Sequence, residues 1–154
     1  MRFCSIASGS SGNCIYVGSE NTHVLVDTGI SGKKMEAGLN SLDLTGRDLD
    51  GILITHEHSD HIKGLGVISR KYGIPIYTTG GTVDAMVRTN ALGKIPDGIF
   101  HEIKEDEPFE IGDLTVNPFS IPHDAAQPVG YRGECGEHSV GIATDLGKYN
   151  EYII

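Results

Sequence analysis

Short apolar runs separated by glycine-rich and polar turns form the pattern of this 154-residue chain. Runs of this length that are rich in β-branched and aromatic residues are typical of strands. We expect strands at residues 2–7, 14–17, 22–27, 50–55, 74–78, 112–122, 129–134 and 138–144. One apolar strand ends at Asp27, and the run DGILIT (50–55) continues directly into a group of histidines.

Three segments have the spacing of helices, with apolar residues three or four positions apart. They cover residues 31–42, 62–73 and 81–91. Ser31 is of a type that caps helices, and Gly73 is of a type that ends them. The resulting order begins with antiparallel strands and then alternates helix and strand. It predicts a single mixed α/β (α+β) domain over residues 1–154, and not a doubly wound nucleotide-binding fold.

Composition and charge narrow the possible partners. The 12 basic and 21 acidic side chains give a net charge of −9, so the overall field does not attract nucleic acid or anionic membranes. A phosphate-bearing substrate would need a local positive centre, which bound metal ions can supply. The three cysteines form no CxxC pair, and the N-terminus does not resemble a signal peptide. No apolar run reaches the ~18 residues of a membrane span, so we expect a soluble, cytoplasmic protein.

The sequence THEHSDH (55–61) concentrates metal-ligand side chains at the exit of a buried strand. Imidazole and carboxylate groups are the ligands that zinc prefers after cysteine. Histidines two residues apart, His56 and His58, can reach one ion, and Asp60 and His61 can reach a second ion beside it. Two neighbouring ions would activate a water and stabilise both oxygens of a hydrolysed bond. The alternative, a solvated polar loop, would leave many titratable groups without partners at a strand end.

These residues also carry a family resemblance. HEHSDH resembles the HxHxDH signature of the metallo-β-lactamase fold superfamily of metallohydrolases. The blocks ASGSSGN, LVDTG, SGKKME, KYGIPIY and HDAAQPVGY make the chain similar to the YycJ/WalJ-type subgroup over residues 3–145. Members of that subgroup are regarded as metal-dependent nucleases with 5′-to-3′ exonuclease activity on DNA. The resemblance therefore implies an αββα sandwich, a DNA substrate and two divalent metal ions.

The resemblance also implies roles for individual residues. It assigns metal ligands to His56, His58 and His123 for one ion, Asp60 and His61 for the other, and Asp145 as a bridge between them. Asp60 is also expected to act catalytically, by orienting the attacking hydroxide. Asp27, in VDTG, corresponds to a carboxylate that braces the histidine loop. The His/Asp donors suit Zn²⁺, Mn²⁺ or Fe²⁺ about equally well, so the metal stays open.

Several residues have a plain structural alternative. A lone histidine such as His123 would usually be a surface residue, and Asp145 could be a helix cap for the segment that follows. The turn SGSSGN (8–13) lacks the spacing of a phosphate-binding P-loop and could be an ordinary hairpin turn. Alternatively, Ser10, Ser11 or Asn13 could donate hydrogen bonds to a substrate phosphate at the mouth of the metal site.

One feature of the family pattern is not found. The second ion in this superfamily takes a further histidine from a late strand of the second αβ half, and no motif follows Asp145. We therefore expect this sequence to supply the first half of the sandwich and the start of the second. Apolar faces that would pack on the remaining half would then be exposed, which predicts a chain that is marginally stable, aggregation-prone or assembled as a homo-oligomer.

The leading functional hypothesis is a hydrolase of phosphodiester bonds, most specifically a DNA exonuclease. A second hypothesis is another chemistry of the same fold, such as hydrolysis of a thioester, a lactam or an RNA end. A third, from a different class, is a non-catalytic metal-binding fragment. The shared metal motif does not separate these hypotheses, because the same ligands serve all of them.

Overall fold

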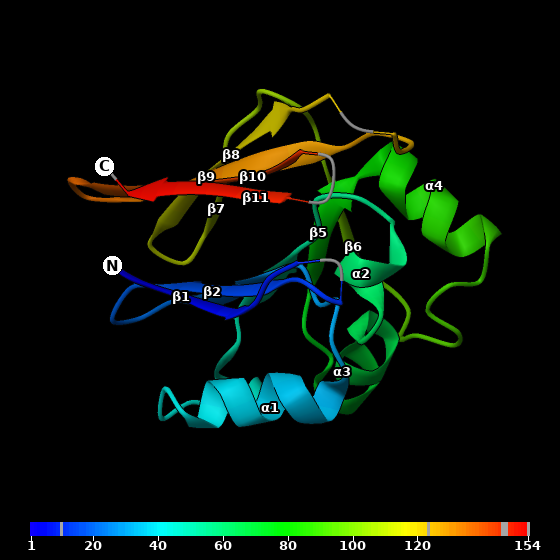
Figure 1. Cartoon of the computed structure of the whole chain (residues 1–154), viewed down its shortest axis with the longest axis horizontal. Coiled ribbons are helices and arrows are strands. Elements are labelled where there is room, and N and C mark those ends of the chain that lie inside the picture. The colour runs from blue at the N-terminus through cyan, green and yellow to red at the C-terminus, as the bar shows by residue number, and fades with distance from the viewer. Residues whose placement is uncertain (10, 123, 146–147, 154) are drawn as a thin grey trace.

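The computed structural model describes the backbone of residues 1–9, 11–122, 124–145 and 148–153, and the side chains of these residues through Ile142 (Figure 1). Two β-sheets lie one above the other, and α1 and α3 cover the outer face of the first sheet. The strands of the first sheet are β1 (Arg2–Ala7), β2 (Cys14–Gly18), β3 (His23–Val26), β4 (Gly51–Leu53), β5 (Ile76–Thr79) and β6 (Phe100–Ile103). The strands of the second are β7 (Phe109–Ile111), β8 (Leu114–Ser120), β9 (Val129–Cys135), β10 (His138–Asp145) and β11 (Lys148–Ile153). The helices are α1 (Gly32–Asn40), η1 (Gly46–Asp48), α2 (Ser59–Ile62), α3 (Leu65–Tyr72) and α4 (Gly80–Arg88).

The first sheet changes direction partway across. Strands β1, β2 and β3 pair antiparallel, whereas β3, β4, β5 and β6 run parallel to one another. The central strand β4 is buried throughout: Ile52 packs among the helices and Leu53 faces the second sheet. Parallel strands end at the same edge of a sheet, so the residues after β3, β4 and β5 meet there. This edge carries the histidine loop.

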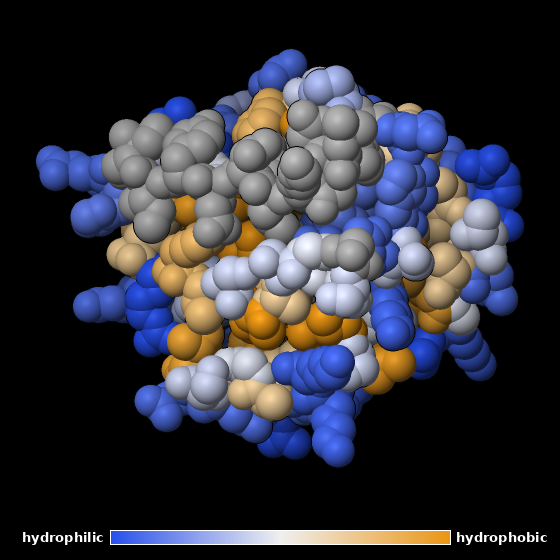
Figure 2. Space-filling view, viewed as in Figure 1, coloured by the Kyte–Doolittle hydropathy of each residue, from blue (hydrophilic) through white to orange (hydrophobic). Residues whose placement is uncertain are grey.

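Two apolar layers hold the fold together. One lies between the first sheet and the helices and includes Met35, Leu39 and Leu65. The other lies between the two sheets and includes Leu53 and Tyr131. In the view of Figure 2, hydrophobic residues gather across the middle of the molecule, and hydrophilic residues lie along its left, right and lower edges. The helices and one sheet thus form two layers, and the second sheet adds a third.

The two sheets are also joined by hydrogen bonds next to the histidine loop. The Tyr131 hydroxyl donates to the carbonyl of Ile54 at 2.7 Å, and the amide of Val129 donates to the carbonyl of Thr55 at 3.0 Å. Burial raises the pKa of the Tyr131 phenol well above its usual value, and the charge of Asp27 raises it further, so the hydroxyl stays a proton donor. The exit of β4 is therefore attached to the second sheet.

Most predicted elements are confirmed, with corrections at the turns. The helix predicted at 62–73 is two helices, because the chain bends at Gly64, where a Cβ would lie 2.1 Å from the carbonyl oxygen of Ile30. The strand predicted at 112–122 starts only at Leu114, because Gly112 has a φ of 57° and forms the turn of the β7–β8 hairpin. Ser31 caps α1 by accepting from the Lys34 amide, as predicted.

Three strands were not predicted: β6, β7 and β11. Strand β6 lies at the edge of the first sheet, and its residues His101 and Glu102 are exposed. An edge strand needs little apolar surface, so its sequence has no buried-strand pattern. Within the described residues, none of the helices is long and apolar enough to span a membrane.

The cysteines generate a first test. All three are free thiols, but Cys14 is fully buried whereas Cys4 and Cys135 are partly exposed. Burial raises the pKa of the Cys14 thiol, and the negative charge of Asp27 adds to the effect. We expect iodoacetamide at pH 8 to modify Cys4 and Cys135 in the native protein and to spare Cys14, because the thiolate is the reacting form. Peptide mass spectrometry measures this, and labelling in denaturant, which should reach all three, is the control. Equal native rates would contradict the buried position of Cys14.

Candidate metal centre

The histidine loop leaves β4 and turns at once into the short helix α2. His56 is buried at the strand exit, His58 is the residue before α2, and Asp60 and His61 lie in its single turn. The ring centroid of His56 lies 4.6 Å from that of His58 and 4.1 Å from that of His61. The turn into α2 therefore gathers the three imidazoles that are spread over six residues of sequence.

Asp27 connects this loop to the end of β3. Its carboxylate is fully buried and accepts three hydrogen bonds: Oδ1 from the Thr55 amide at 2.8 Å, and Oδ2 from the Thr55 hydroxyl at 2.8 Å and from Nδ1 of His61 at 2.6 Å. A buried carboxylate is costly unless it is paired in this way. The residue also has a φ of 64°, a left-handed conformation that Asp tolerates better than most residues. The three hydrogen bonds stabilise Asp27 in this unfavourable backbone conformation.

These hydrogen bonds determine which ring nitrogen carries a proton in two of the histidines, His61 and His56. His61 must donate from Nδ1, because an ionised carboxylate only accepts. The Thr55 hydroxyl gives its one proton to Asp27, so its 2.9 Å contact with Nδ1 of His56 requires that nitrogen to be the donor. In their neutral forms both rings then present Nε2 as the nitrogen with a lone pair, which is the form that ligates metals. Asp27 thus sets one tautomer directly and the other through Thr55.

The electrostatics of His61 follow from the same contact. Burial alone would lower its pKa, but the charge of Asp27, the hydrogen bond to Asp27 and the charge of Asp60 together raise it above the ordinary value. Oδ2 of Asp60 lies 3.6 Å from Nε2 of His61. Asp60 keeps 26% of its side-chain surface exposed, so its carboxylate lies between the buried Asp27–His61 pair and solvent.

A second loop approaches from the other sheet. The Ala126 amide donates to Oε2 of Glu57 at 3.0 Å, which ties residues 124–127 to the histidine loop. The carbonyl of Gln127 accepts from the Thr79 hydroxyl at 2.8 Å, and its Oε1 accepts from the Gly81 amide at 2.8 Å, both at the start of α4. The loop that follows position 123 is therefore anchored at the same edge of the first sheet.

The structure brings together part of the predicted site. His56, His58, Asp60, His61 and Asp27 form one cluster. Asn13 is buried beside it, whereas Ser11 is exposed. His123 and Ser10 lie outside the described residues, and so does the side chain of Asp145, whose backbone ends β10. Sequence reasoning did not assign a role to Thr55; its place between the apolar strand and the first histidine was the available signal.

The donor set fits divalent metal ions. Two imidazole Nε2 atoms with fixed tautomers, a third imidazole and a partly exposed carboxylate converge at one edge of the sheet, which matches the ligands of zinc-type centres. Among the residues with described side chains, no group of three or more His, Cys, Asp or Glu has the geometry to hold an ion by itself. The ligand set would have to include donors beyond this cluster.

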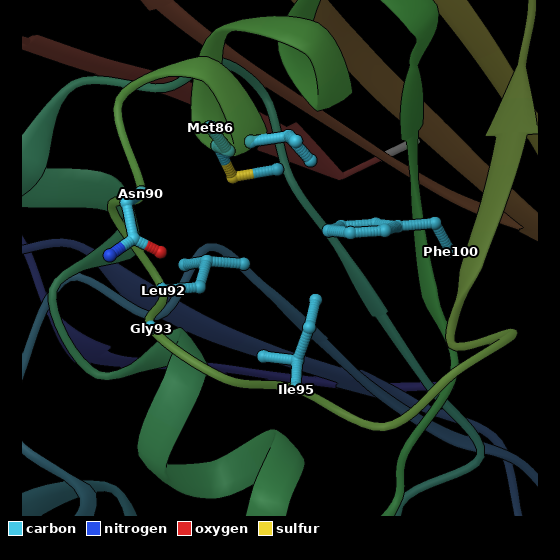
Figure 3. Close-up of a pocket in the computed structure, with 7 residues that line it drawn as sticks. Met86, Asn90, Leu92, Gly93, Ile95 and Phe100 are labelled. Atoms are coloured by element: carbon cyan, nitrogen blue, oxygen red, sulfur yellow. The ribbon is translucent and has the colours of Figure 1, made fainter.

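A cavity elsewhere in the molecule has no histidine, cysteine or acidic side chain in its lining. It has a volume of about 160 Å³ and lies between the end of α4, the following loop and the start of β6. Figure 3 shows that Met86, Leu92, Ile95 and Phe100 point into it, with Asn90 at one side. None of its lining residues is titratable, so the cavity is separate from the chemistry of the histidine loop.

The fold places a cluster of residues of metal-ligand type, in the histidine loop, at the carboxyl edge of a layered α/β sandwich. The chain belongs to the metallo-beta-lactamase superfamily, whose model matches residues 7–153. Members of this superfamily bind divalent metals, typically two.

Relatives and solved structures agree with this assignment. The chain is 42% identical over 151 residues to exodeoxyribonuclease YycJ of Bacillus anthracis, and 40% identical over 150 residues to exodeoxyribonuclease WalJ of Streptococcus pneumoniae. These alignments cover 98% and 97% of this chain and 56% of each relative, so the chain spans about half the length of the curated relatives it matches. The fold is similar to MEM-A1, a subclass B3 metallo-beta-lactamase from a soil metagenome, with a TM-score of 0.69 at 19% identity, over 98% of this chain and 58% of the other.

The three hydrogen bonds accepted by Asp27 can be tested by substitution. We expect Asp27→Asn to lower the free energy of unfolding of the metal-free protein by about 2–4 kcal/mol, because a neutral amide cannot accept from all three donors and leaves buried groups unpaired. Urea denaturation followed by circular dichroism measures this. Asp84→Asn, at an exposed position on α4, is the matched control and should change little. A stability for Asp27→Asn equal to that of the control would show that the carboxylate does not hold the loop.

Gly29 gives a second test through close packing. A Cβ at this position would lie 1.7 Å from the carbonyl oxygen of Asp60, so Gly29→Ala must displace the histidine loop. We expect a loss of about 1–3 kcal/mol in stability together with weaker metal binding. In Gly133→Ala the new methyl would meet only Cγ1 of Val140, at 4.0 Å. Thermal denaturation and metal titration of both variants compare the two sites, and equal behaviour would argue against the close contact.

Proposed function

We propose that this protein is a metal-dependent phosphodiesterase that degrades DNA as a 5′-to-3′ exonuclease. The observation that carries the proposal is the convergence of His56, His58, Asp60 and His61 on one edge of the sandwich, with two ring tautomers set by Asp27. It is supported by the 42% identity with a relative named exodeoxyribonuclease.

In this proposal two divalent ions would bind at the cluster. His56, His58 and His123 would hold one ion, Asp60 and His61 would hold the other, and Asp145 would be a further ligand. When bound, such ions would supply Lewis acidity to the phosphodiester and would activate the attacking water. Zn²⁺, Mn²⁺ and Fe²⁺ all match the nitrogen and oxygen donors.

The chain's own residues orient the reaction. Asp60 is partly exposed, so its carboxylate can accept a hydrogen bond from the attacking water and direct its lone pair at phosphorus. Asp27 and Thr55 engage the Nδ1 atoms of His61 and His56, so the ligating role would fall to the two Nε2 atoms. Glu57 holds the loop after position 123 by accepting from the Ala126 amide, which keeps that loop next to the histidine loop.

The acidic character of the chain bears on how DNA would bind. With a net charge of −9, attraction for a phosphate has to come from local positive charge at the site, so binding should depend on the metal. The three free thiols support a cytoplasmic location, where cysteines stay reduced. Self-association of the chain stays a prediction that its mass in solution tests.

Metal content and DNA cleavage test this function together. We expect two ions per chain by elemental analysis, and progressive release of nucleotides from the 5′ end of a labelled single-stranded DNA. His58→Ala and Asp60→Ala should each reduce the rate by about 10²–10⁴-fold, because each removes a group that acts on the water or its ligand sphere.

His101→Ala is the matched control, because His101 is exposed on β6 and outside the cluster. Parallel assays with RNA, a thioester and a β-lactam identify any other chemistry of the superfamily. Retained metal with no turnover on any of these substrates would favour a non-catalytic binding role, and cleavage unaffected by His58→Ala would place the activity elsewhere.

A further inference from the structure

Asn13 lies beneath the histidine loop and is almost fully buried, with 1% of its surface exposed. Its side-chain amide is oriented by the main chain of its own turn: Oδ1 accepts from the Gly9 amide at 3.0 Å, and Nδ2 donates to the Gly9 carbonyl at 3.0 Å. These two bonds distinguish the oxygen from the nitrogen, so the amino group must face the histidine loop.

The amino group contacts both residues of one proposed ligand pair. Nδ2 lies 3.2 Å from the carbonyl oxygen of Asp60, 3.4 Å from Oδ2 of Asp60 and 3.2 Å from Nε2 of His61. The backbone amide of Asn13 also donates to the Asp60 carbonyl, at 2.8 Å. Asn13 thus holds the main chain of Asp60 through its backbone amide. Its amino group has one proton left after the bond to the Gly9 carbonyl, and that proton is shared among the Asp60 carbonyl, the Asp60 carboxylate and the His61 ring.

We propose that Asn13 is a positioning residue that sets the relative placement of Asp60 and His61 as a ligand pair. The inference rests on the proposed function, because it takes these two residues as ligands of one ion. In the metal-free protein the amino group lies beside Oδ2 of Asp60 and Nε2 of His61, which are 3.6 Å apart. Once Nε2 ligates an ion its lone pair is no longer an acceptor, and the Asp60 carbonyl and carboxylate would keep the amide in place. Because the side chain is buried and its polar atoms are engaged, it has no free face for a substrate phosphate.

The glycines around Asn13 are consistent with this role. Gly9 and Gly12 have φ values of 114° and 146°, which side-chain-bearing residues rarely adopt. A Cβ on Gly12 would lie 2.5 Å from the carbonyl oxygen of Gly29, so this turn presses against the loop after β3. The Gly29 amide in turn donates to the Asn13 carbonyl at 2.8 Å. This turn therefore fixes the side-chain amide of Asn13 beneath Asp60 and His61.

Metal titration of the metal-free chain with Zn²⁺ by calorimetry tests the proposal. The wild type is expected to bind two ions with separate affinities. Asn13→Ala should weaken one ion by about 10–100-fold, the range seen when groups that orient ligands are removed, and leave the other within about twofold. Asn13→Asp keeps the size and shape but places an acceptor against Asp60 and His61, so it should weaken the same ion at least as much as Ala does.

Leu39→Ala separates positioning from general destabilisation. Leu39 is fully buried in the helix–sheet layer on α1, away from the histidine loop, so this variant should lower the melting temperature and leave both zinc affinities unchanged. The proposal is overturned if Asn13→Ala binds both ions like the wild type. It is equally overturned if Leu39→Ala loses the same ion, or if Asn13→Asp restores normal affinity.

A measurement without metal distinguishes this proposal from the proposed function. Hydrogen exchange of the metal-free protein should show faster exchange across residues 57–64 in Asn13→Ala and no such change in Leu39→Ala. If the wild type fails to bind two ions but Asn13→Ala still loosens this segment, the proposed function is wrong and the positioning contact stands. If exchange in the segment is unchanged, Asn13 does not position it.

Discussion

The buried carboxylate of Asp27 is the interaction on which the rest of the site depends. It accepts three hydrogen bonds at the junction of β3 and β4, and these bonds set both the path of the loop and the proton positions on two histidines. A buried carboxylate is stabilised only by such donors. The Asp27 carboxylate therefore depends on the donors of the histidine loop, and the loop depends on the carboxylate for its position. The parallel pairing of β3 with β4 supplies this geometry, because it ends both strands at the same edge.

Close main-chain contact provides the remaining rigidity. Three loops meet around Asp60: the turn that ends at Asn13, the loop that contains Gly29, and the histidine loop itself. Their backbones approach too closely for side chains at the contact points, and glycine is the residue that permits this. The histidines are thus held by neighbouring main chain as well as by side-chain bonds, which limits how far the loop can shift.

The sequence allowed a large part of this to be predicted, and the omissions have physical causes. Buried strands and the histidine cluster carry strong local patterns, so β3, β4 and the loop between 55 and 61 could be placed. The bend at Gly64 and the edge strand β6 could not, because they depend on packing against distant segments and on few apolar residues. The burial of Asn13 was hidden for the same reason: its partners lie 47 and 48 positions away.

The order of these contacts along the chain has a consequence for biosynthesis. Asn13 and Asp27 both precede the histidines they hold, so a growing polypeptide already contains the supporting groups when His56 to His61 are added. The long loops between partners must close before any contact forms, which makes assembly of the ligands a late and cooperative event. Strand β5, which pairs with β4 from the other side, is made afterwards. A nascent chain released before that strand would carry every histidine of the motif but leave one edge of β4, the strand they follow, unpaired.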